Sequence, residues 1–118
     1  MVAEVATALG LRLNQIFVKA RYRQSESQYE KIGETEAIRH ISEQGLTFEV
    51  NLSDYLDTGI FLDHRPMRAR IRVLAAGKRV LNLFAYTGTF TCYALAGRAN
   101  MTTTVDLSKP YCEWARRN

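Results

Sequence analysis

The sequence predicts an α/β protein, with a β-rich N-terminal segment followed by the first half of a parallel, doubly wound sheet. In the last third of the chain, short apolar runs alternate with segments of helical composition. The middle third contains two apolar-rich runs, and in the second of them apolar and polar residues alternate. An order of strand, helix, strand and helix favours a right-handed parallel crossover. We place the boundary between the two parts at residue 62, which gives segments 1–62 and 63–118.

Composition indicates an ordered globular chain, since 47% of its 118 residues are hydrophobic and 24% are charged. The net charge of +4 is compatible with a polyanionic partner but does not identify one. Cys92 and Cys112 fit neither a metal-binding pair nor a disulfide framework. We therefore expect reduced thiols, no metal and a cytoplasmic protein. No apolar run approaches the ~20 residues that span a bilayer, so we expect no membrane partner.

The N-terminal half predicts a strand and a hairpin. Residues 1–10 are mixed and suggest an arm, whereas residues 16–22 alternate in a pattern typical of a half-buried strand with a basic outer face. The polar residues 24–36 predict an exposed loop. The runs 38–42 and 46–52 predict a hairpin with Gly45 in its turn.

The C-terminal half predicts two strands, each followed by a helix. A first helix, 67–76, follows Pro66 and ends at Gly77. The nearly continuous apolar run 79–85 is typical of a strand buried on both faces. A helix over 89–96, a strand over 102–107 and a final helix capped by Ser108 complete the pattern.

The turn after the first parallel strand, residues 82–89, is a candidate ligand site because ligands bind beyond the carboxyl ends of parallel strands. A dinucleotide-binding turn would carry GxGxxG. Here Phe84 and Tyr86 stand where glycines would be needed, and only Gly88 remains. These side chains argue against a pyrophosphate ligand and are compatible with S-adenosylmethionine, which has no phosphate. A turn that uses Gly88 for its geometry alone is an equally good interpretation.

Asp106 ends the second strand, and its position is typical of an acid that accepts both ribose hydroxyls of an adenosine. It could instead stabilise the N-terminus of the last helix, and the two roles can coexist. A third candidate segment precedes both strands, where Asp63 and Arg65 flank His64. Arg65 could bind a ligand carboxylate and Asp63 an ammonium or hydroxyl group. Composition alone favours a surface pair between these two residues.

Three blocks in this chain closely resemble a known family. They are NLSDYLDTGIFLDHRP, VLNLFAYTGTF and TTTVDLSKPYCEWARRN, and the upstream NQIFVKARYRQSESQYEKIGE is also similar. The family is the C-terminal methyltransferase module of the bacterial bifunctional 23S rRNA guanine methyltransferases. The resemblance runs from about Asn14 onward, with the blocks in the family's order and spacing.

The resemblance implies a class I, Rossmann-like methyltransferase sheet, S-adenosylmethionine as cofactor, and methyl transfer to guanine N7 in large-subunit ribosomal RNA. It assigns the first cofactor motif to Asn82, Phe84, Tyr86, Thr87 and Gly88. It makes Asp106 the ribose-binding acid and places Asp63 and Arg65 at the methionine end of the cofactor.

The family's base-positioning motif is expected after Asp106 and is absent from these 118 residues. We therefore assign no catalytic residue and expect an inactive fragment whose unfinished sheet could self-associate. The alternative is a non-catalytic RNA-binding module with a vestigial methyltransferase turn. For RNA contact, the basic face with Lys19, Arg21, Tyr22 and Arg23 could combine phosphate binding with base stacking. A solvated face remains open as the other interpretation.

Overall fold

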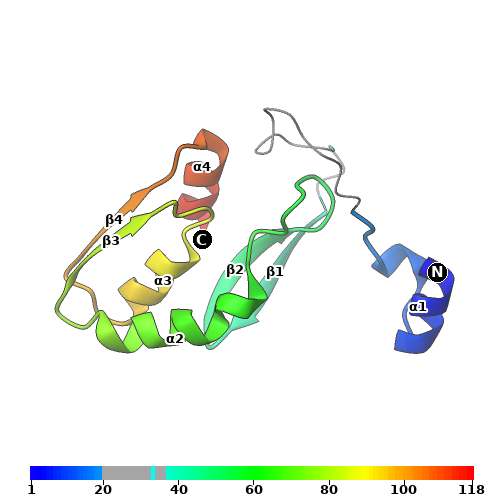
Figure 1. The fold of residues 1–118 in the computed structure, drawn as a ribbon, viewed down its shortest axis with the longest axis horizontal. Helices are drawn as coiled ribbons and strands as arrows, with labels where there is room; N and C mark the ends of the chain where they lie inside the picture. Colours follow the sequence, from blue (N-terminus) through cyan, green and yellow to red (C-terminus); the bar gives the residue numbers. More distant parts are fainter. Residues whose placement is uncertain (20–32, 34–36) are drawn as a thin grey trace.

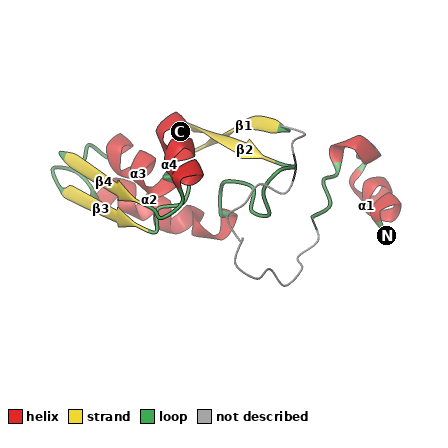
Figure 2. Ribbon diagram, turned by 90° about the horizontal axis from the view of Figure 1, so that it is seen from above, coloured by secondary structure: helices red, strands yellow, loops and turns green. Residues whose placement is uncertain are grey.

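The computed structural model describes residues 1–19, 33 and 37–118 (Figure 1). Within these ranges the N-terminal helix α1 precedes a β-hairpin, which is followed by a helix and a β–α–β unit with a last helix (Figure 2). The bounds are α1 Val2–Leu9, β1 Ile38–Glu43, β2 Leu46–Asn51, α2 Arg65–Leu74, β3 Arg79–Leu83, α3 Thr89–Ala96, β4 Met101–Val105 and α4 Lys109–Arg117.

The predicted hairpin is confirmed. Strands β1 and β2 pair antiparallel, with Glu43 opposite Leu46 across a two-residue turn. Both turn residues have positive φ, 51° at Gln44 and 81° at Gly45. Two left-handed residues give the turn the twist that antiparallel strands require, which explains why glycine stands at the second position.

The parallel crossover is also confirmed, and with it the α/β class. Strands β3 and β4 pair in parallel, and α3 connects them. Helices α2 and α3 pack against each other on one side of this two-stranded sheet (Figure 1). The side chain of Ser108 accepts a hydrogen bond from the backbone N–H of Tyr111, so the predicted cap of α4 is present.

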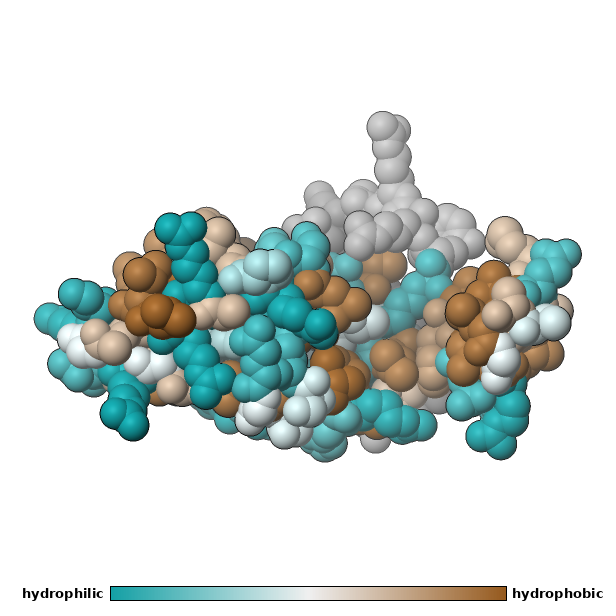
Figure 3. All heavy atoms as spheres, turned by 90° about the horizontal axis from the view of Figure 1, so that it is seen from below, coloured by the Kyte–Doolittle hydropathy of each residue, from teal (hydrophilic) through white to brown (hydrophobic). Residues whose placement is uncertain are grey.

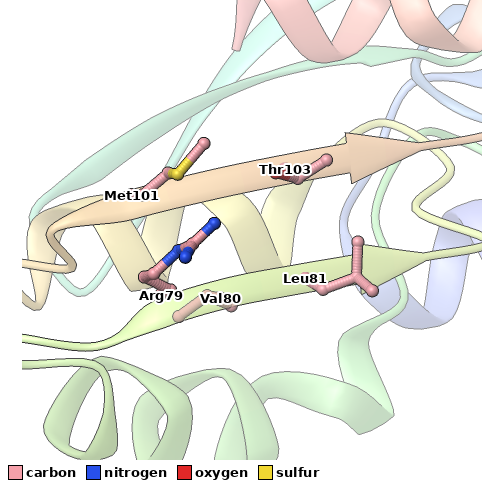
Figure 4. Close-up of a pocket in the computed structure, with 5 residues that line it drawn as sticks. All are labelled: Arg79, Val80, Leu81, Met101 and Thr103. Carbon is pink, nitrogen blue, oxygen red and sulfur yellow. The ribbon is translucent and has the colours of Figure 1, made fainter.

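The expectation that the first parallel strand is buried on both faces is wrong. Along β3 the side chains alternate between exposed and half-buried, and Leu81 and Leu83 are 61% and 53% exposed. Helix α3 covers one face, while no element among the described residues covers the other. Figure 4 shows part of this uncovered face, where Arg79 and Leu81 of β3 lie beside Met101 and Thr103 of β4.

The hydrophobic core joins the hairpin to the parallel unit. Phe48, Val50, Ile60 and Tyr93 form one buried cluster. The rings of Phe48 and Tyr93 stack with centroids 6.0 Å apart and an interplanar angle of 4°. Segments 1–62 and 63–118 therefore share a core through β2 and α3.

The N-terminus differs from the sequence prediction. Residues 2–9 form α1 instead of an arm, because VAEVATAL is rich in helix-favouring alanine and Gly10 ends the helix at φ 63°. Residues 16–19 belong to no strand, and the rest of the predicted basic strand lies outside the described residues. Apolar side chains of the N-terminal segment are exposed at the end of the molecule that α1 forms (Figure 3).

Candidate cofactor site

The turn between β3 and α3 has a left-handed backbone at every second residue. The φ angles are 53° at Phe84, 52° at Tyr86 and 70° at Gly88. For a residue with a Cβ this conformation costs about 1–2 kcal/mol. The turn thus retains at Phe84 and Tyr86 a conformation that glycine favours, although both residues are aromatic. Strain of this kind is concentrated at ligand-binding segments.

Asp106 holds this turn from the end of β4. One carboxylate oxygen, Oδ2, accepts a hydrogen bond of 2.7 Å from the backbone N–H of Tyr86. The other, Oδ1, accepts one of 2.9 Å from the N–H of Ser108. Each carboxylate oxygen has a second lone pair, so Asp106 can still accept hydroxyl groups from a ligand.

Thr87 and Gly88 fix the far side of the turn. Thr87 is buried, and its hydroxyl donates to the carbonyl oxygen of Gly59. At Gly88, an added Cβ would lie 2.7 Å from the Cβ of Ala115 in α4. Glycine is therefore required here both for its positive φ and for the close approach of α4.

A carboxamide that the sequence analysis missed links the turn to the hairpin. The Nδ2 of Asn118 donates to the carbonyl oxygen of Thr87 at 2.7 Å, and its Oδ1 accepts from the N–H of Glu49 at 2.9 Å. Trp114 donates from Nε1 to the carbonyl oxygen of Glu49 at 3.1 Å. The amphipathic spacing of α4 could have indicated Trp114 as a packing residue, but nothing in the sequence singled out Asn118.

The two aromatic residues of the turn have opposite environments. The ring of Tyr86 packs edge-on against Tyr111, with centroids 4.6 Å apart, and lies 5.2 Å from the ring of Phe61. Burial, together with the nearby Tyr111, raises the pKa of Tyr86, so its phenol stays protonated. Phe84, in contrast, is 93% exposed, and so is Leu107 after Asp106. Two large apolar side chains therefore stand open at the carboxyl ends of adjacent strands.

Asn82 is directed into the layer between sheet and helix. Its Nδ2 donates to the hydroxyl of Thr91 at 3.0 Å, and that hydroxyl lies 2.8 Å from the hydroxyl of Thr104. The side-chain amide of Asn82 thus joins β3 to α3 and, through Thr91, to β4. This side chain therefore supports the turn from the side that faces α3.

The segment with Asp63 and Arg65 lies beside the turn through Phe61 and His64. The side chains of Asp63 and Arg65 themselves interact with other residues. Phe61 packs against Tyr86, and the ring of His64 lies 5.9 Å from that of Phe90. The side chain of Asp63 is 80% exposed, and its carboxylate is 3.9 Å from the imidazole of His64. The predicted pair between Asp63 and Arg65 is not formed.

Arg65 instead binds Glu43, a residue that sequence reasoning did not find. The Nε of Arg65 donates to Glu43 Oε2 at 2.8 Å, and the buried Arg68 donates to both carboxylate oxygens at 2.8 and 2.9 Å. The hydroxyl of Tyr93 adds a bond of 2.9 Å. Burial alone would raise the pKa of Glu43, but these hydrogen bonds together lower it.

Of the predicted RNA-binding residues, only Lys19 lies within the described ranges. Its Nζ donates to the carbonyl oxygens of Asn51 and Tyr55, so the ammonium faces the protein. Burial lowers the pKa of Lys19, against the opposing effect of Asp57 and Asp54. Arg21, Tyr22 and Arg23 lie outside the described residues.

In residues 1–19, 33 and 37–118 no group of three potential metal ligands is present. No helix in the same ranges is long and apolar enough to cross a membrane.

Comparison with known proteins decides the family. The model of the S-adenosylmethionine-dependent methyltransferases matches residues 3–118. The chain belongs to this family. The "Ribosomal RNA large subunit methyltransferase K/L" of Pseudomonas paraeruginosa is 53% identical over 117 residues, 98% of this chain and 16% of that protein. The protein of the same name from Allochromatium vinosum is 57% identical over 105 residues, 88% of this chain and 14% of that protein. The chain therefore spans about one sixth of the length of these relatives.

A solved structure supports the same cofactor. A chain named as a methyltransferase and complexed with SAH is 39% identical to this chain, with a TM-score of 0.65 over 82% of this chain and 23% of that one. S-adenosylmethionine is the cofactor of the family to which this chain belongs. The residues at the turn fit such a ligand. The left-handed residues allow the backbone of the turn to approach a ligand closely. The Asp106 carboxylate keeps lone pairs for ligand hydroxyl groups, and the ring of Phe84 is exposed to solvent.

Proposed function

We propose that this chain is the cofactor-binding part of an enzyme that methylates N7 of a guanine in large-subunit ribosomal RNA. The observation that carries the proposal is the strained turn at Phe84, Tyr86 and Gly88, anchored on the carboxylate of Asp106. Left-handed backbone at aromatic residues is costly in folding, and a ligand that packs on the turn accounts for its retention. The names of the relatives support ribosomal RNA as the methyl acceptor.

The turn would hold the adenosine end of the cofactor. Asp106 accepts the ribose hydroxyls, and Phe84, Tyr86, Thr87 and Gly88 form the surface on which the cofactor lies, with Asn82 bracing that surface from within. When bound, S-adenosylmethionine supplies a methyl group activated by the positive charge on its sulfonium. The chain's own contribution is to bind and orient the donor.

Asp63 and Arg65 would act at the methionine end. The exposed carboxylate of Asp63 suits the ammonium group, and the guanidinium of Arg65 suits the carboxylate. Arg65 now binds Glu43, but Arg68 donates to both oxygens of that carboxylate. Arg65 can therefore turn toward a ligand while Arg68 continues to neutralise Glu43.

For RNA, we propose that Arg21 and Arg23 bind phosphates and that Tyr22 stacks on a base. Lys19 completes this basic segment, with its ammonium already engaged by two carbonyl oxygens.

A cofactor titration tests the first half of the proposal. In calorimetry, the chain should bind S-adenosylhomocysteine and show no heat with NAD, because Phe84 and Tyr86 leave no glycine cradle for a pyrophosphate. Binding of neither ligand would leave only the non-catalytic RNA-binding module.

A chimera tests the chemistry. The 117 aligned residues of the Pseudomonas paraeruginosa relative would be replaced by this chain. With 23S rRNA and S-adenosylmethionine we expect 7-methylguanine, and we expect none on a transcript made with 7-deazaguanine. Methylation that persists on the 7-deaza transcript would exclude N7 as the acceptor.

A further inference from the structure

The charged side chains between the start of α2 and the end of β4 are all positive. Between His64 and Val105 the sequence contains no aspartate or glutamate, whereas it contains Arg65, Arg68, Arg70, Arg72, Lys78, Arg79 and Arg98. The structure accounts for three of these cations: Arg65 and Arg68 bind Glu43, and Arg72 donates to the carbonyl oxygen of Gln44. The remaining four cations are exposed.

Three of the exposed cations, Lys78, Arg79 and Arg98, gather at the amino ends of the strands, and we call them the basic corner. They come from the loop before β3, the first residue of β3 and the loop before β4. This end of the sheet is opposite the turn that carries Phe84. Among the described residues, none of the three forms an ion pair with a carboxylate.

Backbone hydrogen bonds fasten the two loops to each other. The N–H of Gly77 donates to the carbonyl oxygen of Arg98 at 2.9 Å, and the N–H of Asn100 donates to that of Lys78 at 2.8 Å. The side chain of Asn100 adds a bond of 3.1 Å to the carbonyl oxygen of Gly77. The backbones that carry the three cations are therefore held at fixed positions.

Helix dipoles explain only part of this arrangement. Helices α2 and α3 end at Leu74 and Ala96, just before these loops, and a cation near a helix C-terminus contributes about 0.3–1 kcal/mol. That role needs one cation for each helix end. Three exposed like charges on fastened loops repel one another, and a polyanion would relieve that repulsion.

We infer that the basic corner binds backbone phosphates of the ribosomal RNA substrate, an inference that rests on the proposed function. Strands of five residues, at ~3.3 Å per residue, place the corner only about 16 Å from the cofactor turn. A folded RNA that presents a base at the carboxyl ends of the strands can therefore also reach their amino ends. Because phosphate contacts carry no sequence information, the corner orients the RNA and does not select the base.

Charge reversal with a matched control tests the inference on the 118-residue chain. The test variant is K78E/R98E. The control, R39E/R116E, changes the net charge equally at exposed arginines on β1 and α4. Anisotropy with a folded 23S rRNA fragment would be followed from about 50 to about 200 mM salt. In the test variant the slope of log K against log salt should fall by about 2, and affinity at 0.1 M salt by on the order of tenfold per lost contact. The control should keep its slope.

Three other outcomes would overturn the inference. Equal losses in the two variants would show an effect of net charge alone. A lower melting temperature with unchanged RNA binding in K78E/R98E would mean that the cations only stabilise helix ends. If the unmodified chain binds S-adenosylhomocysteine but no RNA, the inference fails while the cofactor half of the proposed function stands. Binding of RNA through the corner without any binding of S-adenosylhomocysteine would instead contradict the proposed function.

Discussion

The carboxylate of Asp106 accepts a hydrogen bond from the backbone N–H of Tyr86 at a distance of 2.7 Å, so the acid at the end of β4 supports the turn after β3. We expect Asp106→Ala to weaken S-adenosylhomocysteine binding by about 1.5–3 kcal/mol for each charge-assisted hydrogen bond lost. Calorimetry is the measurement. Glu113→Ala, which removes an exposed carboxylate from α4, is the control and should bind as the unmodified chain does. Equal affinities for Asp106→Ala and the control would remove Asp106 from the site.

Two substitutions of Phe84 distinguish its effect on stability from its effect on cofactor binding. Phe84→Gly should relieve the left-handed strain of about 1–2 kcal/mol, offset by the ~0.5–1 kcal/mol entropic penalty of glycine, so stability should be unchanged or slightly higher. Phe84→Ala retains the strain and, because Phe84 is 93% exposed, loses little packing. Both should weaken S-adenosylhomocysteine binding to the same extent, because both remove the ring. Urea unfolding and calorimetry measure the two effects, and full affinity in both variants would contradict a role for Phe84.

Gly88→Ala should destabilise the chain more than Gly10→Ala. Both glycines have positive φ, 70° and 63°, so each substitution carries the left-handed cost of about 1–2 kcal/mol. At Gly10 no atom lies within 4 Å of an added Cβ, whereas at Gly88 the Cβ of Ala115 would be 2.7 Å away. We expect this overlap to add about 1–3 kcal/mol in urea unfolding. Equal destabilisation at the two sites would mean that α4 can move aside.

Glu43→Gln should destabilise the fold by about 3–5 kcal/mol, because it leaves the buried Arg68 without its counter-charge. The folded pKa of Glu43 is lowered, so its ionised form contributes stability that is present above the unfolded value of about 4.3. That contribution is lost as pH falls through the folded pKa. The difference in unfolding free energy between the unmodified chain and Glu43→Gln should therefore shrink below about pH 4.3. A difference independent of pH would show that Glu43 acts through packing alone.

Lys19 should matter more for stability than for RNA. Lys19→Met leaves two carbonyl acceptors without their donor and should destabilise the chain by roughly 1 kcal/mol. For Lys19→Met, the slope of log K for RNA binding against log salt should change little. For R21E/R23E the slope should become shallower, because those guanidinium groups are proposed to bind phosphates. A slope that falls by about 1 in Lys19→Met alone would show that its ammonium reaches a phosphate.

Local patterns predicted the elements that depend on local chemistry. Gly45 indicated the hairpin turn, Ser108 the cap of α4, and the residues of α3 the helix between the parallel strands. The turn at Phe84, Tyr86 and Gly88 was also located from sequence, because its position after an apolar strand is a local signal. Its left-handed backbone was not predicted, because aromatic residues ordinarily avoid that conformation.

Contacts between distant segments could not be predicted. Glu43 stands beside a hairpin turn, where a carboxylate is ordinarily solvated, and its partners Arg65 and Arg68 lie more than twenty residues along the chain. The apolar run of β3 likewise does not indicate which of the two faces of the strand another element covers. Resemblance to the family supplied the candidate residues, but it did not indicate that Arg65 would be engaged by Glu43.

The carboxamide of Asn118 also bears on the order in which the chain can fold. Its two hydrogen bonds reach back 31 residues to Thr87 and 69 residues to Glu49. During synthesis the hairpin emerges long before Tyr93, Trp114 and Asn118, so Phe48 has no partner ring until the parallel unit is made. Contacts of such long sequence separation slow folding, since loop-closure entropy must be overcome first. A ribosome that stalls within α3 would therefore hold a nascent hairpin with an open apolar face, which is a substrate for chaperones.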